Sequence, residues 1–394
     1  MVTTGGATRG LAQEYAVVTR VPRHDLQTTD PSLLRLPSGR LLATWAFRDH
    51  GGPGTPGWDA IPTERVRLAT SSDNGATWRE LPPIAANTGH PFLHRGELHL
   101  LVDGHGRRNL MIARSRDEGE SWTPFVTLFE GSYWNTPSGT AVKQDQWYLG
   151  FGVPNIDGVY NARGSGLVVL AADLRRDLLQ VSSWRLSEPL RYPGTPNSLS
   201  AGLSDRPDHW LEPNVVNVRG HLRLVARCRI DHQATANLAA ICDVEDGENE
   251  RPRLSFRQFY PVPGGQGNFY ILRDPVGGLF WMLSNLPTDS QNTALMHQLR
   301  ARGFTEVSGG AGDERRFLVL SFSVDALNWF NACFLAMTPE PLQSFHYATP
   351  LIDGEDLLFL SRTSCDAPNQ HDSDLITFHR LSGFRRLAPK FLCV

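Results

Sequence analysis

The chain has 394 residues, of which 40% are hydrophobic and 20% are charged, and its formal net charge is −3. This composition can fill a sizeable core, and the lack of a basic stripe or of a long apolar run argues against nucleic-acid binding and against a membrane-spanning helix. The 36 glycines and 27 prolines favour many short elements joined by turns over long helices.

Short apolar runs recur between turn residues along the chain, and they can be laid out as six units of four strands each. The units cover residues 28–82, 85–130, 133–190, 208–261, 266–337 and 343–388, and an early strand at 14–21 is expected to complete the last sheet. Evenly spaced short strands of this kind are typical of radial β repeats. The sequence therefore predicts a single all-β domain, a six-bladed β-propeller. Seven blades would need another unit within 190–210 or 286–314, where the alternation is poor.

One short pattern occurs twice at the same spacing, as "TSSDNGATW" at 70–78 and as "RSRDEGESW" at 114–122. A degenerate copy, "SVDALNW", occupies 323–329. Aspartates accept hydrogen bonds from the backbone of their own turns, and glycine supplies the left-handed backbone that such turns need. We interpret the pattern as a structural turn between the third and fourth strands of a blade, at its outer edge.

The Ser-x-Asp-x-Gly-x-x-Trp pattern resembles the Asp-box (BNR) repeats of the sialidase superfamily. The resemblance covers nearly the whole chain and implies an exo-glycosidase site, in which three arginines hold a substrate carboxylate, a Glu assists a Tyr nucleophile and an Asp is the acid/base. "LEPNVVNVRGHLRLVAR" supplies Glu212 and Arg227, "SFHYATPLIDGEDL" supplies Tyr347, and "PGWDAIPTERV" supplies Asp59, with Glu64 as its rival.

The chain departs from this family at the arginines. Thr29 stands where the first arginine is expected, and the third has no clear equivalent, because Arg315 and Arg316 begin a different strand. The resemblance therefore implies a divergent member that lacks the full arginine triad. Arg48 and Arg362 are the candidates to replace the missing contacts.

Polar residues concentrate where the inner strands begin and where the second strands end, as a sugar-binding pocket would require. We expect catalytic roles for Asp59, Glu212, His346 and Tyr347. We expect substrate contacts from Asp30, Arg48, His90, Asn135, Asn214, Arg227, Asn268, Arg362, His371 and Asp372. Structural alternatives exist for these residues, since Asp59 could be a surface turn residue, Tyr347 a core residue and Glu212 the partner of Arg227 in a buried ion pair. The loop "NQHDSDL", 369–375, could face the substrate, lie in solvent or bind a metal; we predict that it faces the substrate.

Two chemistries compete for these residues. A retaining glycosidase would use Asp59 with Tyr347, activated by Glu212, and a Tyr nucleophile suits an anionic sugar. A lyase acting at a uronate would use a His or Tyr as base and an arginine to neutralise the carboxylate. A propeller that binds a glycan or a protein without catalysis is the third alternative. We expect a carbohydrate substrate, no nucleic-acid or membrane partner, and no cofactor or metal; the sequence does not indicate the oligomeric state.

The five cysteines, at 228, 242, 333, 365 and 393, include no Cys-x-x-Cys pair, so the sequence predicts neither a zinc site nor a disulfide framework. Residues 1–15 contain no apolar core of signal-peptide length. We therefore expect a cytoplasmic protein, or a secreted one if an export signal has been removed.

Overall fold

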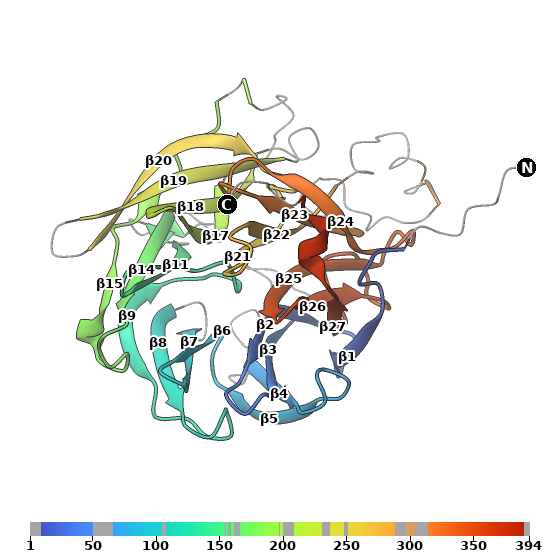
Figure 1. Ribbon diagram of the computed structural model, residues 1–394, viewed down its shortest axis with the longest axis horizontal. Helices are drawn as coiled ribbons and strands as arrows, with labels where there is room; N and C mark the ends of the chain where they lie inside the picture. The colour runs from blue at the N-terminus through green and yellow to red at the C-terminus, as the bar shows by residue number, and fades with distance from the viewer. Residues whose placement is uncertain are drawn as a thin grey trace, which may run out of the picture.

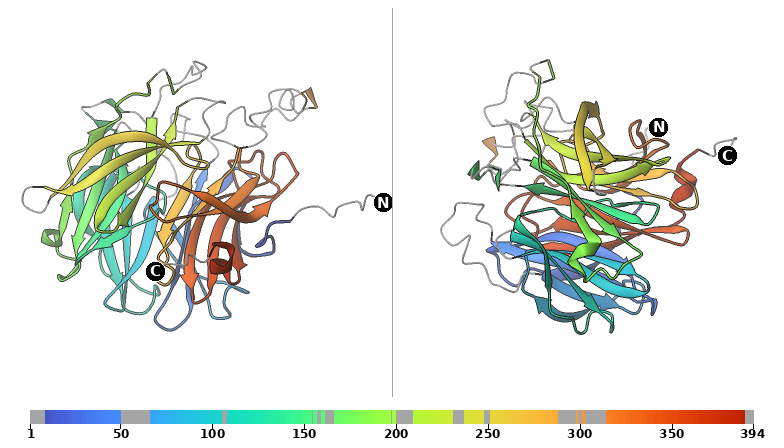
Figure 2. Two further views of the ribbon diagram at one scale, coloured as in Figure 1. Left: turned by 45° about the horizontal axis from the view of Figure 1, so that its top comes forward. Right: turned by 90° about the vertical axis from the view of Figure 1, so that its left-hand side faces the viewer.

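The fold is a ring of antiparallel β-sheets, as Figure 1 shows. The computed structural model describes residues 9–49, 66–104, 108–153, 155–156, 159–160, 166–196, 198–199, 209–230, 237–247, 251–287, 298, 301–302 and 314–389. Six sheets surround a central axis, and the two views of Figure 2 show the same ring from other sides. The predicted six-bladed propeller is confirmed. No helix within these ranges is long and apolar enough to cross a membrane.

Each of the first three sheets is built from strands in chain order, and the third is interrupted by a two-stranded ribbon. The first consists of β2 (Leu26–Arg35), β3 (Leu41–Asp49), β4 (Val66–Ser71) and β5 (Arg79–Ile84). The second consists of β6 (Thr88–His94), β7 (Glu97–Gly104), β8 (Arg108–Ser115) and β9 (Val126–Ser132). The third consists of β10 (Ala141–Lys143), β11 (Gln146–Val153), β14 (Gly166–Asp173) and β15 (Trp184–Leu186), and β16 (Leu190–Arg191) also pairs with β14. A separate ribbon joins β12 (Asn155–Ile156) to β13 (Val159–Tyr160).

The last three sheets follow the same plan, except that the final one takes a strand from the start of the chain. The fourth consists of β17 (His209–Val218), β18 (His221–Arg229), β19 (Leu238–Asp246) and β20 (Pro252–Pro261). The fifth consists of β21 (Phe269–Arg273), β22 (Phe280–Asn285), β23 (Phe317–Ser323) and β24 (Phe330–Met337). The sixth consists of β25 (Ser344–Asp353), β26 (Asp356–Ser364), β27 (Leu375–Leu381) and β1 (Tyr15–Arg20), and β1 pairs antiparallel with β27.

The Ser-Asp-Gly-Trp turns lie between β4 and β5 and between β8 and β9. In the first, Ser71 Oγ donates to Asp73 Oδ1 at 2.8 Å, and the backbone N–H of Thr77 donates to the same oxygen at 2.9 Å. Gly75 has φ +94 and donates its N–H to Ser71 Oγ at 2.8 Å. These hydrogen bonds lower the pKa of Asp73 to about 2, the side-chain bond from Thr77 being the largest cause. Figure 1 places β5 at the outside of the ring, away from its centre.

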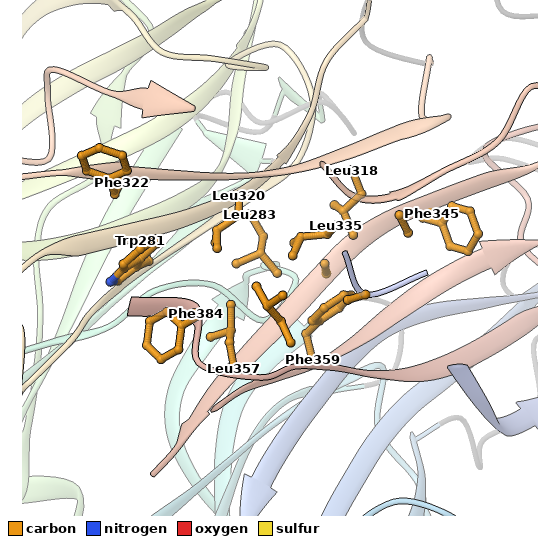
Figure 3. Close-up of a cluster of buried hydrophobic side chains, with 14 of the residues drawn as sticks. Trp281, Leu283, Leu318, Leu320, Phe322, Leu335, Phe345, Leu357, Phe359 and Phe384 are labelled. Atoms are coloured by element: carbon orange, nitrogen blue, oxygen red, sulfur yellow. The ribbon is translucent and has the colours of Figure 1, made fainter. Parts of the chain in front are cut away.

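The hydrophobic core lies mainly between neighbouring sheets. Figure 3 shows one such cluster, where β22 and β23 of the fifth sheet meet β25 and β26 of the sixth. Trp281 and Phe359 are fully buried there, and Phe384 of a short 3-10 helix, Phe384–Leu387, packs against the Trp281 ring with 5.0 Å between centroids. Aromatic side chains of this size dominate the energy of a core, so inter-sheet packing of this kind holds adjacent blades together.

Three innermost strands carry the same irregularity. The pairing register shifts between Thr29 and Ser32 in β2, between Leu211 and Asn214 in β17, and between His346 and Thr349 in β25. In each case a residue inside the shift has a left-handed backbone: Asp30 with φ 52, Glu212 with φ 51 and Tyr347 with φ 48. A bulge redirects a side chain relative to the regular alternation of a strand. The side chains of Asp30, Glu212 and Tyr347 therefore depart from the regular alternation of the inner strands.

Candidate active site

Two of the three bulge residues belong to one connected group of polar side chains. Non-glycine residues in left-handed conformation are uncommon, cost free energy and concentrate at functional sites. Two of the three, Glu212 and Tyr347, are joined directly, since the Tyr347 hydroxyl donates to Glu212 Oε1 at 2.7 Å. The bulge positions thus bring together two residues that lie 135 positions apart in the sequence.

Arg227 completes the centre of this group. Its Nη1 lies 3.0 Å from Glu212 Oε2 and 3.1 Å from the Tyr347 hydroxyl oxygen. Asn268 Nδ2 donates to Glu212 Oε2 at 2.9 Å. Glu212 and Arg227 are 1% and 2% exposed. The geometry brings three predicted site residues, Arg227, Tyr347 and Asn268, around the carboxylate of a fourth, Glu212.

The charge state of Glu212 follows from its partners. Burial raises the pKa of a carboxyl group, but the positive charge of Arg227 and the hydrogen bonds from Asn268, Tyr347 and Arg227 outweigh it, so the pKa of Glu212 is lowered. The carboxylate is therefore ionised at neutral pH and accepts the proton of the Tyr347 hydroxyl in a hydrogen bond. This arrangement can remove that proton when the phenol oxygen attacks an electrophile.

Two more arginines flank the Tyr347 ring. The guanidinium carbons of Arg362 and Arg315 lie 4.8 Å and 5.1 Å from the ring centroid. Burial, as the largest cause, lowers the pKa of Arg362 to about 10, which still leaves the side chain positively charged at neutral pH. With Arg227, three cationic groups surround one phenol ring. Such a cluster can bind a carboxylate on a ligand.

A second cluster lies around Asp30. Its carboxylate pairs with Arg48 and accepts a hydrogen bond from Thr29 Oγ1 at 2.8 Å and one from Thr88 Oγ1 at 3.2 Å. Burial opposes ionisation of Asp30, but Arg48 and then Arg362 lower its pKa. The carboxylate thus already has an arginine partner. Arg48 is used in this pair and does not lie over the Tyr347 ring as Arg362 does.

His90 is 7% exposed and packs edge-on against Phe151, with 5.6 Å between ring centroids. Burial is the main reason why the pKa of His90 is lowered to about 4. The ring is therefore neutral at neutral pH. Its predicted contact with substrate remains a prediction.

The amides of Asn135 and Asn214 serve the backbone. Asn135 Nδ2 donates to the carbonyl oxygen of Gly150 at 2.7 Å. Asn214 Oδ1 accepts from the N–H groups of Gly139 and Ile271, at 2.7 Å and 3.0 Å. The Asn214 hydrogen bonds tie β17 to Gly139, just before β10, and to β21 of the fifth sheet, whereas the Asn135 bond is to β11 of the third sheet. The substrate contacts predicted for both residues remain predictions, and the structure gives each amide a structural role as well.

Three predicted residues, His346, His371 and Asp372, follow one another outward from Tyr347. The rings of His346 and Tyr347 are 5.3 Å apart between centroids, and those of His346 and His371 are 6.3 Å apart. His346 is fully buried, whereas the His371 side chain is 43% exposed. His371 Nδ1 lies 2.7 Å from Asp372 Oδ1.

Sequence reasoning set Arg315 aside because it begins a different strand, and the structure brings it to Tyr347. The predicted Asp59 and its rival Glu64 lie outside the described residues. Arg315 precedes β23, yet its carbonyl oxygen accepts the N–H of Phe345 at 3.0 Å, which carries it to the start of β25. No local sequence pattern encodes that contact between blades. Within the described ranges, no group of three or more His, Cys, Asp or Glu side chains is arranged to hold a metal ion.

A separate cavity of about 670 Å³ lies between the fourth and fifth sheets. Its lining includes Tyr260, Val262, Leu286 and Trp329, and it contains none of the predicted site residues. The polar group at the inner strands therefore lies apart from this cavity.

Comparison with solved structures identifies similar folds. The chain is similar to a Trypanosoma rangeli sialidase solved in complex with sialic acid (12% identity, TM-score 0.56, covering 98% of this chain and 60% of that one). It is similar to a GH93 α-L-arabinofuranosidase of Fusarium graminearum (13% identity, TM-score 0.52, 95% and 98% covered). It is also similar to a protein of unknown function from Dyadobacter fermentans (11% identity, TM-score 0.55, 94% and 98% covered).

Neither a scan against protein-family models nor a search of curated proteins gave a match. At identities of 11–14% the structural neighbours establish the fold, a sialidase-like propeller that glycosidases also use, and fold alone does not determine activity. The sequence-based resemblance to sialidases is confirmed at this level.

Proposed function

We propose that the protein is an exo-glycoside hydrolase that acts on a terminal acidic sugar. The observation that carries the proposal is the hydrogen bond of 2.7 Å between the Tyr347 hydroxyl and the Glu212 carboxylate, with Arg227 in contact with both. An ionised carboxylate fixed against a phenol is what a Tyr nucleophile requires. Structural neighbours that are glycosidases make a glycan the natural substrate class.

In the proposed reaction the Tyr347 oxygen attacks the anomeric carbon while its proton passes to Glu212. The bond to the leaving oxygen breaks, and that oxygen takes a proton from an acid/base. Water then cleaves the sugar from Tyr347, giving its proton to the same acid/base, and Glu212 returns the first proton to the phenol oxygen. The net change is the addition of one water across the glycosidic bond with retention of configuration. Asp59 is the acid/base predicted from the sequence.

The acidic nature of the sugar follows from charge. Arg227, Arg315 and Arg362 surround Tyr347, and a carboxylate on the substrate would neutralise part of this positive field. A neutral nucleophile such as Tyr also avoids the repulsion that a carboxylate nucleophile would meet from such a substrate. In this proposal Arg315 and Arg362, which lie over the Tyr347 ring, take the role of the arginine that the chain lacks at Thr29.

A uronate-cleaving lyase is the second candidate, and one observation favours it. The His371–Asp372 pair combines a part-exposed imidazole with nearby arginines. A base next to a carboxylate-neutralising cation is the minimum that β-elimination needs. A glycan-binding propeller without catalysis is the outcome to accept if no product forms.

The test is incubation with 4-methylumbelliferyl glycosides of sialic acid and of hexuronic acids, and with oligouronates. Hydrolysis releases methylumbelliferone or reducing sugar, whereas elimination produces the ultraviolet absorbance of an unsaturated uronate. We expect hydrolysis by the wild-type protein. Tyr347→Phe should lower kcat by about 1,000-fold, of the order seen when a catalytic group is removed, while the circular dichroism spectrum stays unchanged. Activity retained in Tyr347→Phe would overturn the nucleophile assignment.

A further inference from the structure

His346 lies beside Tyr347 and His371 lies beside His346, with ring centroids 5.3 Å and 6.3 Å apart, and the surroundings of the two histidines differ. His346 is fully buried, Arg315 Nη1 lies 2.8 Å from its Nδ1, and its Nε2 lies 2.8 Å from Ser373 Oγ. Arg315 can only donate, so His346 Nδ1 is the acceptor and Nε2 carries the proton. Both ring nitrogens are occupied, and burial, followed by the charges of Arg315 and Arg362, lowers the pKa of His346 well below its usual value. This ring holds Arg315 in place and has no nitrogen left for a substrate.

His371 has the opposite arrangement. It lies between β26 and β27, its side chain is 43% exposed, and its Nδ1 is 2.7 Å from Asp372 Oδ1. Since the carboxylate of Asp372 accepts, the neutral ring carries its proton on Nδ1 and leaves a lone pair on Nε2. Nε2 makes no hydrogen bond to any other described residue. A histidine oriented by a carboxylate, with its second nitrogen open, is the arrangement used for proton transfer.

The pair is held rigidly by its own loop. Asn369 Oδ1 accepts the N–H groups of His371 and Asp372, at 2.8 Å and 2.7 Å, and Asn369 Nδ2 donates to Asp372 Oδ2 at 3.0 Å. Arg362 Nη2 donates to the His371 carbonyl oxygen at 2.6 Å. The same guanidinium lies over the Tyr347 ring, so one side chain fixes the pair relative to the nucleophile proposed above.

We infer that His371, oriented by Asp372, is the proton-transfer group that acts on the leaving oxygen of the sugar, and that His346 positions Arg315. This inference rests on the proposed hydrolase function and assigns to His371 the step that the sequence assigned to Asp59. In the first step the protonated ring gives the Nε2 proton to the departing oxygen as the glycosidic bond breaks. In the second, neutral Nε2 takes a proton from the attacking water, which restores the starting state.

The charges that face His371 determine how this step depends on pH. Partial burial lowers the pKa of His371, the hydrogen bond with Asp372 opposes that change, and the charges of Arg315 and Arg362 lower the pKa further. The nearby ring of His346 is neutral. A bound carboxylate would offset the arginine charges and raise the pKa of His371 in the complex. Because the protonated form is needed first, kcat should fall as pH rises through that value.

The experiment compares two leaving groups in three histidine variants. A 4-methylumbelliferyl glycoside leaves readily without an acid, whereas a methyl glycoside of the same sugar does not. His371→Asn should lower kcat for the methyl glycoside by about 100-fold or more and lower kcat for the 4-methylumbelliferyl glycoside much less. In this variant kcat should no longer fall at high pH. His346→Asn should slow both substrates equally and keep the pH dependence. His221→Asn, an exposed position at the far end of β18, should change neither.

Equal slowing of both substrates by His371→Asn, or leaving-group dependence in Asp59→Ala alone, would overturn the assignment. ¹⁵N NMR of the histidine rings is a separate readout, which should show the Nδ1–H tautomer for His371 and the Nε2–H tautomer for His346. If the wild-type protein turns over none of the glycosides, the proposed function fails and the NMR result decides the pair. In that case, an Nε2–H tautomer of His371 would contradict the proposed His371–Asp372 pair, and an Nδ1–H tautomer that titrates would support it.

Discussion

The buried pair of Glu212 and Arg227 gives the candidate site a measurable signature in stability. Both side chains are almost fully buried, and Arg227 Nη1 contacts both carboxylate oxygens. Removing one member of a buried ion pair leaves a charge without its partner and costs about 3–5 kcal/mol. We therefore expect Glu212→Ala to lower the free energy of unfolding by that amount in urea denaturation followed by circular dichroism.

A matched control and a double variant separate this effect from simple loss of a side chain. Glu80 pairs with Arg67 at 2.9 Å but is 51% exposed, so Glu80→Ala should cost about 0–1 kcal/mol. Glu212→Ala combined with Arg227→Met should recover part of the loss, because no buried charge remains unpaired. Equal costs for Glu212→Ala and Glu80→Ala would show that the buried pair does not contribute to stability as described.

At the scale of residues, the sequence predicted some members of the candidate site and not others. Glu212 and Arg227 could be found because both stand in apolar strands of one blade, where a buried carboxylate needs a cation. Arg315 could not, because it reaches Tyr347 through a contact between the fifth and sixth blades. Asn135 and Asn214 show the opposite difficulty, because both were predicted to contact the substrate and both bind the backbone. A polar residue on an inner strand can face the channel or the backbone of the next blade, and the sequence pattern is the same for both.

The turns that repeat the Ser-Asp-Gly-Trp pattern act at the scale of strands and blades. Between β4 and β5, Ser71 and Asp73 fix the turn by hydrogen bonds, and Gly75 adopts φ +94. A Cβ added to Gly75 would lie 2.2 Å from Cε1 of Phe378, which belongs to β27 in the sixth blade. The turn thus packs against the neighbouring sheet, so its backbone geometry affects the contact between the first and sixth blades. Its position could be predicted from the sequence because it depends on local hydrogen bonds.

Gly75→Ala and Gly39→Ala test that link as a matched pair. Gly39 also has positive φ, +87, but an added Cβ there meets nothing within 4 Å. Both substitutions should cost about 1 kcal/mol for the left-handed backbone. Gly75→Ala should cost about 1–3 kcal/mol more because Phe378 must move. Similar urea midpoints for the two variants would mean that the turn does not depend on the neighbouring blade.

At the scale of the whole molecule, the ring is closed by a strand from one end of the chain. β1 pairs with β27, so the sixth sheet contains residues from both ends of the described chain. Val18 of β1 is buried in a cluster with Leu358 and Phe378 of the sixth sheet and Leu41 of the first. Its neighbour Val17 is 48% exposed. The side chain of Val18 therefore makes the contact that closes the ring, whereas the side chain of Val17 faces solvent.

Val18→Asp and Val17→Asp provide the test of ring closure. A carboxylate at Val18 would be buried among apolar side chains without a partner, and we expect a loss of about 3 kcal/mol or more in the free energy of unfolding. At Val17 the same change is solvated and should stay within about 0.5 kcal/mol. Hydrogen exchange should quicken in Val18→Asp at the amides of β27 and, because the cluster joins both sheets, at those of β3. Faster exchange confined to β1 itself would mean that the ring stays closed without this strand.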